Sequence, residues 1–392
     1  EWTSIPNGRN MHRNVFWRHD TGPKAPFSAF DSIYPRDLWT YLEAHRNEGL
    51  DNFAIPHNGN VSDGWMYSPN EFLGGPMDAR HAELQARNEP LTEIIQTKGS
   101  SDTHPALSPN DEFADFELFP NLINVGQPSQ IKYGYIRQGL VEGMILEDKL
   151  GTNPFKMGIV SGADSHSAYS NNEEFNFHGS HGVTDDTPQK RLNPGMSPSG
   201  EPGAIVGSAG ATGVWAEENT REAIFDAMKR KEVYGTSGPL IRLRFFGGWG
   251  YPSNLTSDKD FVKKAYADGV PMGRDLPAMP RGAKAPTVAV AKAKAPPPKP
   301  KASPPVPPKD NAAPNSTPPA NTKPAGPTPA QRAAAEAYPG FAKRLVQLRA
   351  NLQLGDAIAA CRLFVATHLG TMVAGLVERQ QKDLRQKLDQ VR

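Results

Sequence analysis

Cysteine is nearly absent from this chain: Cys361 is the only one among 392 residues. A single cysteine excludes an intrachain disulfide and any thiolate metal cluster. A metal site in this protein must therefore use nitrogen and oxygen ligands. Both cytosolic and periplasmic proteins can be poor in cysteine, so the cysteine content does not distinguish between these two compartments.

An excess of one charge sign is also missing. Lys and Arg number 43 and Asp and Glu 42, which leaves a formal net charge of +1. This balance gives no general attraction to nucleic acid or to an anionic membrane, so we expect a small molecule as the partner. One stretch, residues 357–377, has the length of a membrane span, but it contains Arg362 and His368. Because a charge at mid-bilayer is costly, we expect amphipathic pairing or oligomerisation there instead.

The chain opens with Glu1 and shows neither the basic nor the apolar segment of a secretory leader. We expect a fragment that lacks the true N-terminus of its protein.

Composition divides the chain into three parts. Residues 1–282 are globular in character, whereas residues 283–330 are rich in Ala, Pro and Lys. Such a segment buries too little apolar surface to offset chain entropy, which predicts a disordered, extended linker. Residues 331–392 carry apolar residues at three- and four-residue steps, which predicts a helical tail that could self-associate.

The globular part alternates between helix and strand patterns. A helix is predicted over residues 35–49 and another over residues 219–233, with basic residues in its last turn. Apolar strands are predicted at residues 52–56, before His57, and at residues 157–160. An alternating strand is predicted at the start of the segment LTEIIQTKGSSDTHP, residues 91–105. This alternation favours a parallel α/β sheet, either open or closed into a barrel.

Imidazoles and carboxylates follow three of the predicted strands. They are His57, the segment Glu93–His104, and Asp164 with His166. In a barrel these strand ends converge on one face. Such ligands, held on rigid strand ends, suit a hydrolytic Zn, Mn or Fe site.

Each of these residues also has a simpler interpretation. Asp164 could cap a following helix, His57 could be a turn residue, and His104 could be an ordinary loop histidine. His178 and His181 resemble a metal pair, but their glycine-rich surroundings equally favour a loop. Only the combination of strand ends favours a functional site.

Several long motifs carry a family resemblance. The segments EWTS, MHRNVFWR, AIPHNGNVSDG and GADSH, together with the long segment QTKGSSDTHPALSPNDEFADFE, resemble the bacterial group called domain of unknown function 3604 over about residues 1–287. That group is similar in turn to the PHP superfamily, the polymerase and histidinol phosphatase hydrolases. The resemblance implies a distorted PHP-type (β/α)7 TIM-like barrel with two or three divalent metals, Zn, Mn or Fe, at its strand ends.

The resemblance also implies roles for particular residues. The metal ligands would be Glu1, which would bridge two cations, together with His12, His57, Asp164 and His166. Asp164 would also accept the nucleophile's proton. Lys98 and His104 are candidates for contacting a small anionic substrate. The implied activity is that of a metal-dependent phosphoesterase that uses a metal-bound hydroxide.

Two departures leave other functions open. The superfamily begins with a His-x-His strand and then an Asp-His strand, and neither motif occurs in this chain. We therefore expect a barrel that is incomplete at its N-terminus. The family's barrel should also be followed by a further β-rich segment after APTVAV, whereas this chain continues with AKAKAPPPKPK. The alternatives are a metal-dependent amidohydrolase on the same architecture, and a non-catalytic fragment or fusion with a helical interaction tail.

Overall fold

The computed structural model describes residues 1–123, 125–166, 172–173, 177, 179–180, 185, 187–192, 205–282 and 286–292. These residues belong to one compact unit, Glu1–Ala302. The predicted tail over residues 331–392 and most of the predicted linker lie outside them. Within the described ranges, no helix combines the length and the apolar character needed to cross a bilayer.

Short helices and strands alternate along the chain. The helices are α1 (Pro35–Asn47), α2 (Ala79–Asn88), α3 (Ile136–Leu150), α4 (Pro188–Leu192), α5 (Arg221–Lys229) and α6 (Phe261–Asp268), with 3₁₀ turns at Pro6–Gly8, Gly59–Val61 and Leu255–Ser257. The strands are β1 (Arg13–Trp17), β2 (Asn52–Pro56), β3 (Leu91–Glu93), β4 (Ile95–Gln96), β5 (Gly99–Ser100), β6 (Gly158–Val160), β7 (Ala211–Val214), β8 (Val233–Thr236), β9 (Leu243–Gly248), β10 (Gly269–Pro271) and β11 (Thr287–Lys292).

Local signals explain where two of the helices begin. Pro35 occupies the first turn of α1, where its missing N–H costs no hydrogen bond. The Thr220 side chain accepts a hydrogen bond from the Ala223 N–H and so caps α5. Both helices predicted from the sequence are confirmed, with slightly shorter bounds.

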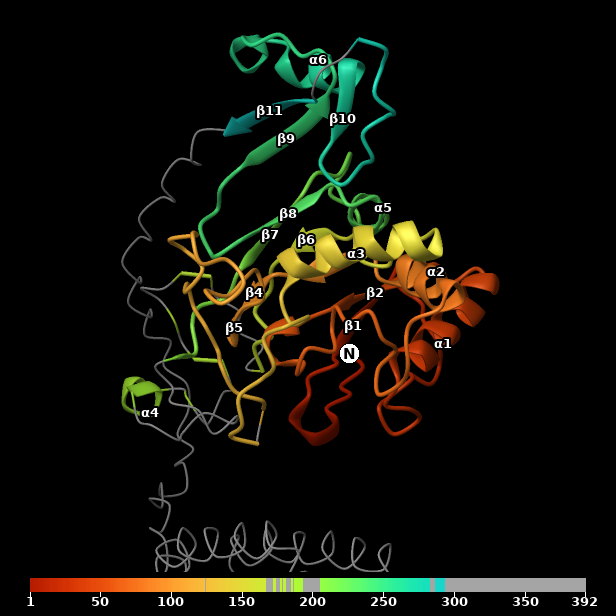
Figure 1. Ribbon diagram of the computed structural model, residues 1–392, viewed down its shortest axis with the longest axis vertical. Coiled ribbons are helices and arrows are strands. Elements are labelled where there is room, and N and C mark those ends of the chain that lie inside the picture. Colours follow the sequence, from red (N-terminus) through yellow and green to blue (C-terminus); the bar gives the residue numbers. More distant parts are fainter. Residues whose placement is uncertain are drawn as a thin grey trace, which may run out of the picture. The chain divides into compact units, whose positions relative to one another are not determined.

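A row of neighbouring strands runs in the order β1, β2, β3, β6, β8 and β7, whereas β4 and β5 form a separate two-stranded sheet (Figure 1). β1 pairs antiparallel with β2, β3 pairs parallel with β6, and β7 pairs antiparallel with β8. β2 also lies against β3, and β6 against β8. Among the described pairings only β3–β6 is parallel, and a closed seven-stranded barrel stays a prediction.

The core covers both faces of this row. All five residues of β2 are buried. Phe53 and Ile55 pack with Phe225 of α5 on one face, whereas Ala54 packs with Leu38 of α1 on the other. A strand covered on both faces favours apolar residues, which explains the apolar run at residues 53–56 of β2. The exception is Asn52, whose buried side-chain amide donates to the Leu42 and Leu50 carbonyls.

A second small sheet follows β8. β9 pairs antiparallel with β10 on one side and with β11 on the other, and Phe246 of β9 packs against Phe261 of α6. β11 lies within residues 283–330, which we expected to be linker. Composition suggested a linker, but Thr287, Val288 and Val290 are β-branched residues that suit a strand added to the edge of β9.

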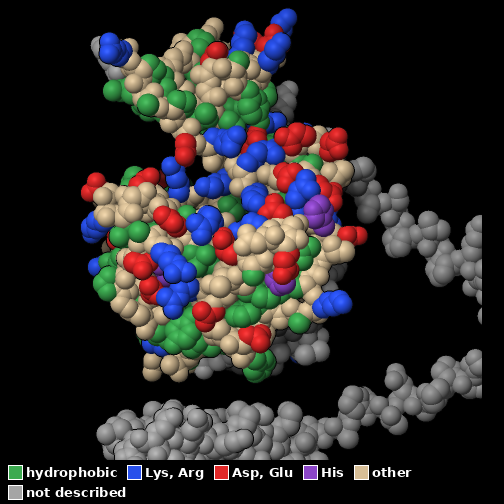
Figure 2. All heavy atoms as spheres, turned by 90° about the vertical axis from the view of Figure 1, so that its right-hand side faces the viewer, with side chains coloured by type: hydrophobic (Ala, Val, Ile, Leu, Met, Phe, Trp, Pro, Cys, Tyr) green, Lys and Arg blue, Asp and Glu red, His purple; other side chains and the backbone are tan. Residues whose placement is uncertain are grey.

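The described surface matches the balanced charge of the sequence. Figure 2 shows acidic and basic side chains interspersed over one face of the molecule. This face therefore offers no large area of a single charge sign to a polyanionic partner.

Candidate metal centre

The register of β1 and β2 brings two histidines together. Arg13 is paired with Pro56, and the next positions along, His12 and His57, extend the same register. The backbone N–H of His57 donates a hydrogen bond to the backbone carbonyl of His12 at 3.4 Å. Side chains of opposed residues project to the same face of a sheet. The two rings accordingly meet edge to face, with their centroids 5.5 Å apart.

Glu1 completes this group from the other side of β1. Trp2 forms an antiparallel bridge with Arg13, and side chains alternate along an extended segment, so Glu1 points away from the buried Trp2 ring. The Glu1 Oε1 atom lies 2.9 Å from His12 Nδ1 and 3.3 Å from His57 Nε2. One ligand atom from each of Glu1, His12 and His57 falls within 4.8 Å of the others.

Electrostatics hold this group in a charged state. Burial alone would raise the pKa of Glu1, but the adjacent imidazoles of His12 and His57 hold it well below its usual range. Burial would lower the pKa of His57, but contacts with Glu1, Glu93 and Asp164 outweigh it and raise that pKa. Burial lowers the pKa of His12. A proton therefore resides preferentially on His57, where a cation would replace it.

The donor set fits a divalent cation. Among the described residues, His57 Nε2, the atom that faces Glu1, is buried without a well-aligned hydrogen-bond partner, which is costly unless a ligand completes it. Tetrahedral ligands about 2.0–2.1 Å from an ion lie about 3.3 Å from one another. The Glu1–imidazole distances of 2.9 and 3.3 Å are close to that separation. Two imidazoles and one carboxylate are also the protein ligands of several catalytic zinc and iron sites.

Asp164 lies on the opposite side of the His57 ring. Its Oδ2 atom is 3.9 Å from His57 Nδ1 and accepts a hydrogen bond from Gln96 Nε2 at 3.0 Å. The Lys98 ammonium contacts the same oxygen. His166 Nε2 lies 3.4 Å from Asp164 Oδ1. The structure thus divides the five predicted ligands into Glu1, His12 and His57 on one side and Asp164 with His166 on the other.

The charges around Asp164 favour its carboxylate form. Burial raises its pKa, but the charges of Lys98 and His57 and the hydrogen bond from Gln96 hold the pKa well below its usual range. Lys98 is itself buried, at 5% exposure. Its charge is therefore neutralised by Asp164 rather than presented to solvent.

Two residues of this site have a left-handed backbone. Asn58, which follows His57, has φ of 59° and Asp164 has φ of 49°. Asn and Asp adopt this conformation more readily than other side chains, at a cost of about 1 kcal/mol or more. Such strain clusters at functional sites, and here it aims both side chains at one hydrogen bond, Asn58 Nδ2 to Asp164 Oδ2 at 3.4 Å.

Glu93 is a site residue that the sequence analysis placed only within a segment. It ends β3 opposite Val160 of β6, and its Oε1 atom lies 4.0 Å from His57 Nδ1. Its side chain is 7% exposed. Burial and the nearby charge of Asp164 raise the pKa of Glu93 to about 7. Its position at a strand end was the available signal, whereas nothing in the sequence marked Gln96 or Asn58.

The remaining candidates lie elsewhere. His104 packs against Tyr135, with ring centroids 5.7 Å apart, and its Nδ1 accepts the Ala106 N–H at 3.1 Å. In the described part of the chain, no hydrogen bond or ion pair joins His104 to the cluster, so its contact with a substrate stays a prediction. His178 and His181 lie outside the described residues.

Comparison with known proteins gives a family but no activity. Neither curated proteins nor solved structures gave a match to this chain. A family model described as "Protein of unknown function (DUF3604)" matches residues 1–301. This span includes every residue of the candidate site, and the chain belongs to the DUF3604 family.

Proposed function

We propose that this protein is a metal-dependent hydrolase built on a PHP-type barrel, with phosphoesters as its substrates. The observation that carries the proposal is the convergence of Glu1, His12 and His57, whose ligand atoms lie within 4.8 Å of one another. Three protein ligands leave coordination positions open for water and substrate, as catalytic sites require. Structural sites, in contrast, have all their coordination positions filled by protein ligands.

The ligand residues and their neighbours have separable tasks. Glu1, His12 and His57 would hold the cation, whose charge would activate water and stabilise a developing oxyanion. Asn58 Nδ2 and Gln96 Nε2 each lie 3.3 Å from His57 Nδ1 and would fix the orientation of its ring. The Glu93 and Asp164 carboxylates approach the same side of the ring at 4.0 and 3.9 Å. The resemblance to PHP proteins assigns Asp164 the acceptance of a proton from the attacking water, although its carboxylate faces His57 Nδ1 and not the Nε2 atom that faces Glu1.

The preference for a phosphoester rests on two supports. The resemblance to PHP proteins favours this substrate class, and Lys98 provides a cation within the site. Because Lys98 is paired with Asp164, it becomes available to an anion only when Asp164 binds a cation or a proton instead. Anion binding at Lys98 is therefore expected only after Asp164 takes up a proton or a second cation.

The first test is the metal content of the purified full chain, measured by elemental analysis. The comparison is with the double variant His57→Ala, Asp164→Ala and with His45→Ala, whose imidazole pairs with Glu48 outside the cluster. We expect near-stoichiometric Mn, Fe or Zn in the parent and in His45→Ala, and loss of metal in the double variant.

Activity then separates the reaction classes. The metal-loaded chain is assayed against a panel of phosphoesters, amides and lactones. Hydrolysis of phosphoesters that disappears in the double variant supports the proposal. Hydrolysis of amides alone would replace it with an amidohydrolase, and equal, negligible metal in all three proteins would indicate a non-catalytic fragment.

A further inference from the structure

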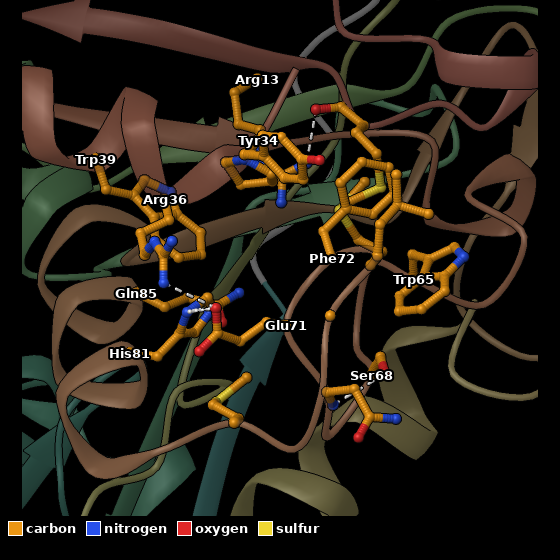
Figure 3. A pocket seen from close by; sticks show the side chains of 17 residues that line it. Arg13, Tyr34, Arg36, Trp39, Trp65, Ser68, Glu71, Phe72, His81 and Gln85 are labelled. Atoms are coloured by element: carbon orange, nitrogen blue, oxygen red, sulfur yellow. Dashed lines mark hydrogen bonds and ion pairs between the residues drawn. The ribbon is translucent and has the colours of Figure 1, made fainter. Parts of the chain in front are cut away.

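A pocket lies on the opposite face of the segment that carries His12. Side chains alternate along residues 11–13, so His12 points to the metal cluster while Met11 and Arg13 point to the pocket. The pocket has a volume of about 170 Å³ and is bounded by α1, α2 and the loop between β2 and α2 (Figure 3). It is therefore distinct from the candidate metal centre.

Apolar groups form most of its wall. Met11, Met66 and Met77 line it and are no more than 6% exposed. The rings of Trp39 and Phe72 add two further buried surfaces. Thioethers and aromatic rings make favourable contacts with an aromatic ligand, and methionine adapts to its outline.

The charged groups at this pocket occur in matched pairs. Beneath it, Arg13 Nε donates to Glu89 Oε1 at 2.8 Å, and both side chains are fully buried. At its mouth, Arg36 Nη1 lies 3.0 Å from Glu71 Oε2 (Figure 3). A charged ligand would have to break one of these pairs and leave its partner unsatisfied. The pocket therefore favours a neutral ligand.

One polar atom has no hydrogen bond. His81, in the first turn of α2, is 7% exposed, and its Nδ1 is buried without a hydrogen-bond partner among the described residues. The nearest carboxylate oxygen, Glu71 Oε2, is 3.5 Å away (Figure 3). A ligand hydroxyl or ring N–H would satisfy this nitrogen, since leaving such a group unpaired is costly.

We propose that this pocket binds a small neutral aromatic molecule that carries one hydroxyl or ring N–H group, of which phenol is the simplest example. The size follows from the volume, because an apolar cavity of about 150 Å³ is known to hold benzene. The aromatic and methionine walls select the ring, and His81 selects its polar group. This inference does not depend on the proposed hydrolase activity.

The test uses fluorine NMR of fluorinated probes with the full chain. We expect 4-fluorophenol to bind with a Kd of roughly 1 mM or tighter, as a single-ring ligand can. Fluorobenzene should bind about five- to tenfold more weakly, because it lacks one hydrogen bond. The charged analogues 4-fluorobenzoate and 4-fluorobenzylammonium should bind more weakly still.

Two variants and one control locate the site. Met77→Trp should fill the pocket and abolish binding, whereas Met144→Trp, at a position 60% exposed on α3, should leave binding unchanged. His81→Phe should bind 4-fluorophenol and fluorobenzene equally, and it remains informative if Met77→Trp does not fold. Absence of 4-fluorophenol binding, tighter binding of a charged analogue, or undiminished binding in a folded Met77→Trp variant would each overturn the proposal.

Discussion

Gly162 makes room for the Glu93 carboxylate. A Cβ atom at position 162 would lie 2.5 Å from Glu93 Oε2, closer than such atoms approach in real structures. We expect Gly162→Ala to displace the Glu93 side chain and to lower the free energy of unfolding by about 1–3 kcal/mol. Urea unfolding of the metal-free protein measures this change.

A double-mutant cycle identifies the cause of that loss. Adding Glu93→Ala to Gly162→Ala removes the clashing carboxylate, so the double variant should regain part of the stability. Gly250→Ala serves as the control, because no atom lies within 4 Å of a Cβ there. Strictly additive losses from the two substitutions would show that the clash is not the cause.

The raised pKa of Glu93 predicts a pH-dependent stability in the metal-free protein. Burial raises this pKa from 4.5 to about 7, so the folded state binds the proton more tightly than the unfolded state. The stability from neutral Glu93 is complete below pH 4.5 and is lost as the pH rises through 7. Glu93→Gln, which is neutral throughout, should be more stable than the parent at pH 8 by about 1–3 kcal/mol.

Urea titrations at pH 4.5 and pH 8 in the presence of a chelator measure this difference. The advantage of Glu93→Gln should largely disappear at pH 4.5, where both side chains are uncharged. Equal advantages at the two pH values would exclude ionisation of Glu93 as the cause.

Metal affinity should depend on both histidines and on pH. The pKa of His57 is raised, so below that pKa a cation must displace a proton, and affinity should fall about tenfold per pH unit. His12→Gln and His57→Gln should weaken Zn²⁺ binding at least about tenfold at pH 8, whereas His45→Gln should not. Competition with a chromophoric chelator at pH 6, 7 and 8 gives these affinities. An equal loss in the His45 variant would count against the site.

The buried pair Arg13–Glu89 should dominate the stability of the region between β1 and α2. Its side chains are 1% and 0% exposed, and Glu89 also accepts the Trp39 indole N–H at 2.8 Å. Arg13→Met leaves an unpaired buried carboxylate, which should cost about 3–5 kcal/mol. Arg87→Met, at a side chain 52% exposed, should cost less than about 1 kcal/mol. Chemical unfolding compares the two, and similar losses would contradict the prediction.

Short-range signals explain what could be predicted of the fold. Pro35 and Thr220 mark helix starts, and the apolar runs before His57 and Asp164 mark strands. Strand β11 was missed because composition over a long window hid six residues whose partner, β9, supplies the pairing. Pairing between distant segments leaves little trace in either segment alone.

The same contrast between local sequence signals and tertiary pairing applies to the candidate site. The sequence alone determined that a metal site must use nitrogen and oxygen ligands, and it identified His57 and Asp164 as groups at strand ends. Tertiary structure decided which candidates meet: the antiparallel register of β1 and β2 opposes His12 to His57, and Lys98 pairs with Asp164. The physical reason is the two-residue period of side chains in a strand, because a register shift of one residue would turn His12 to the opposite face.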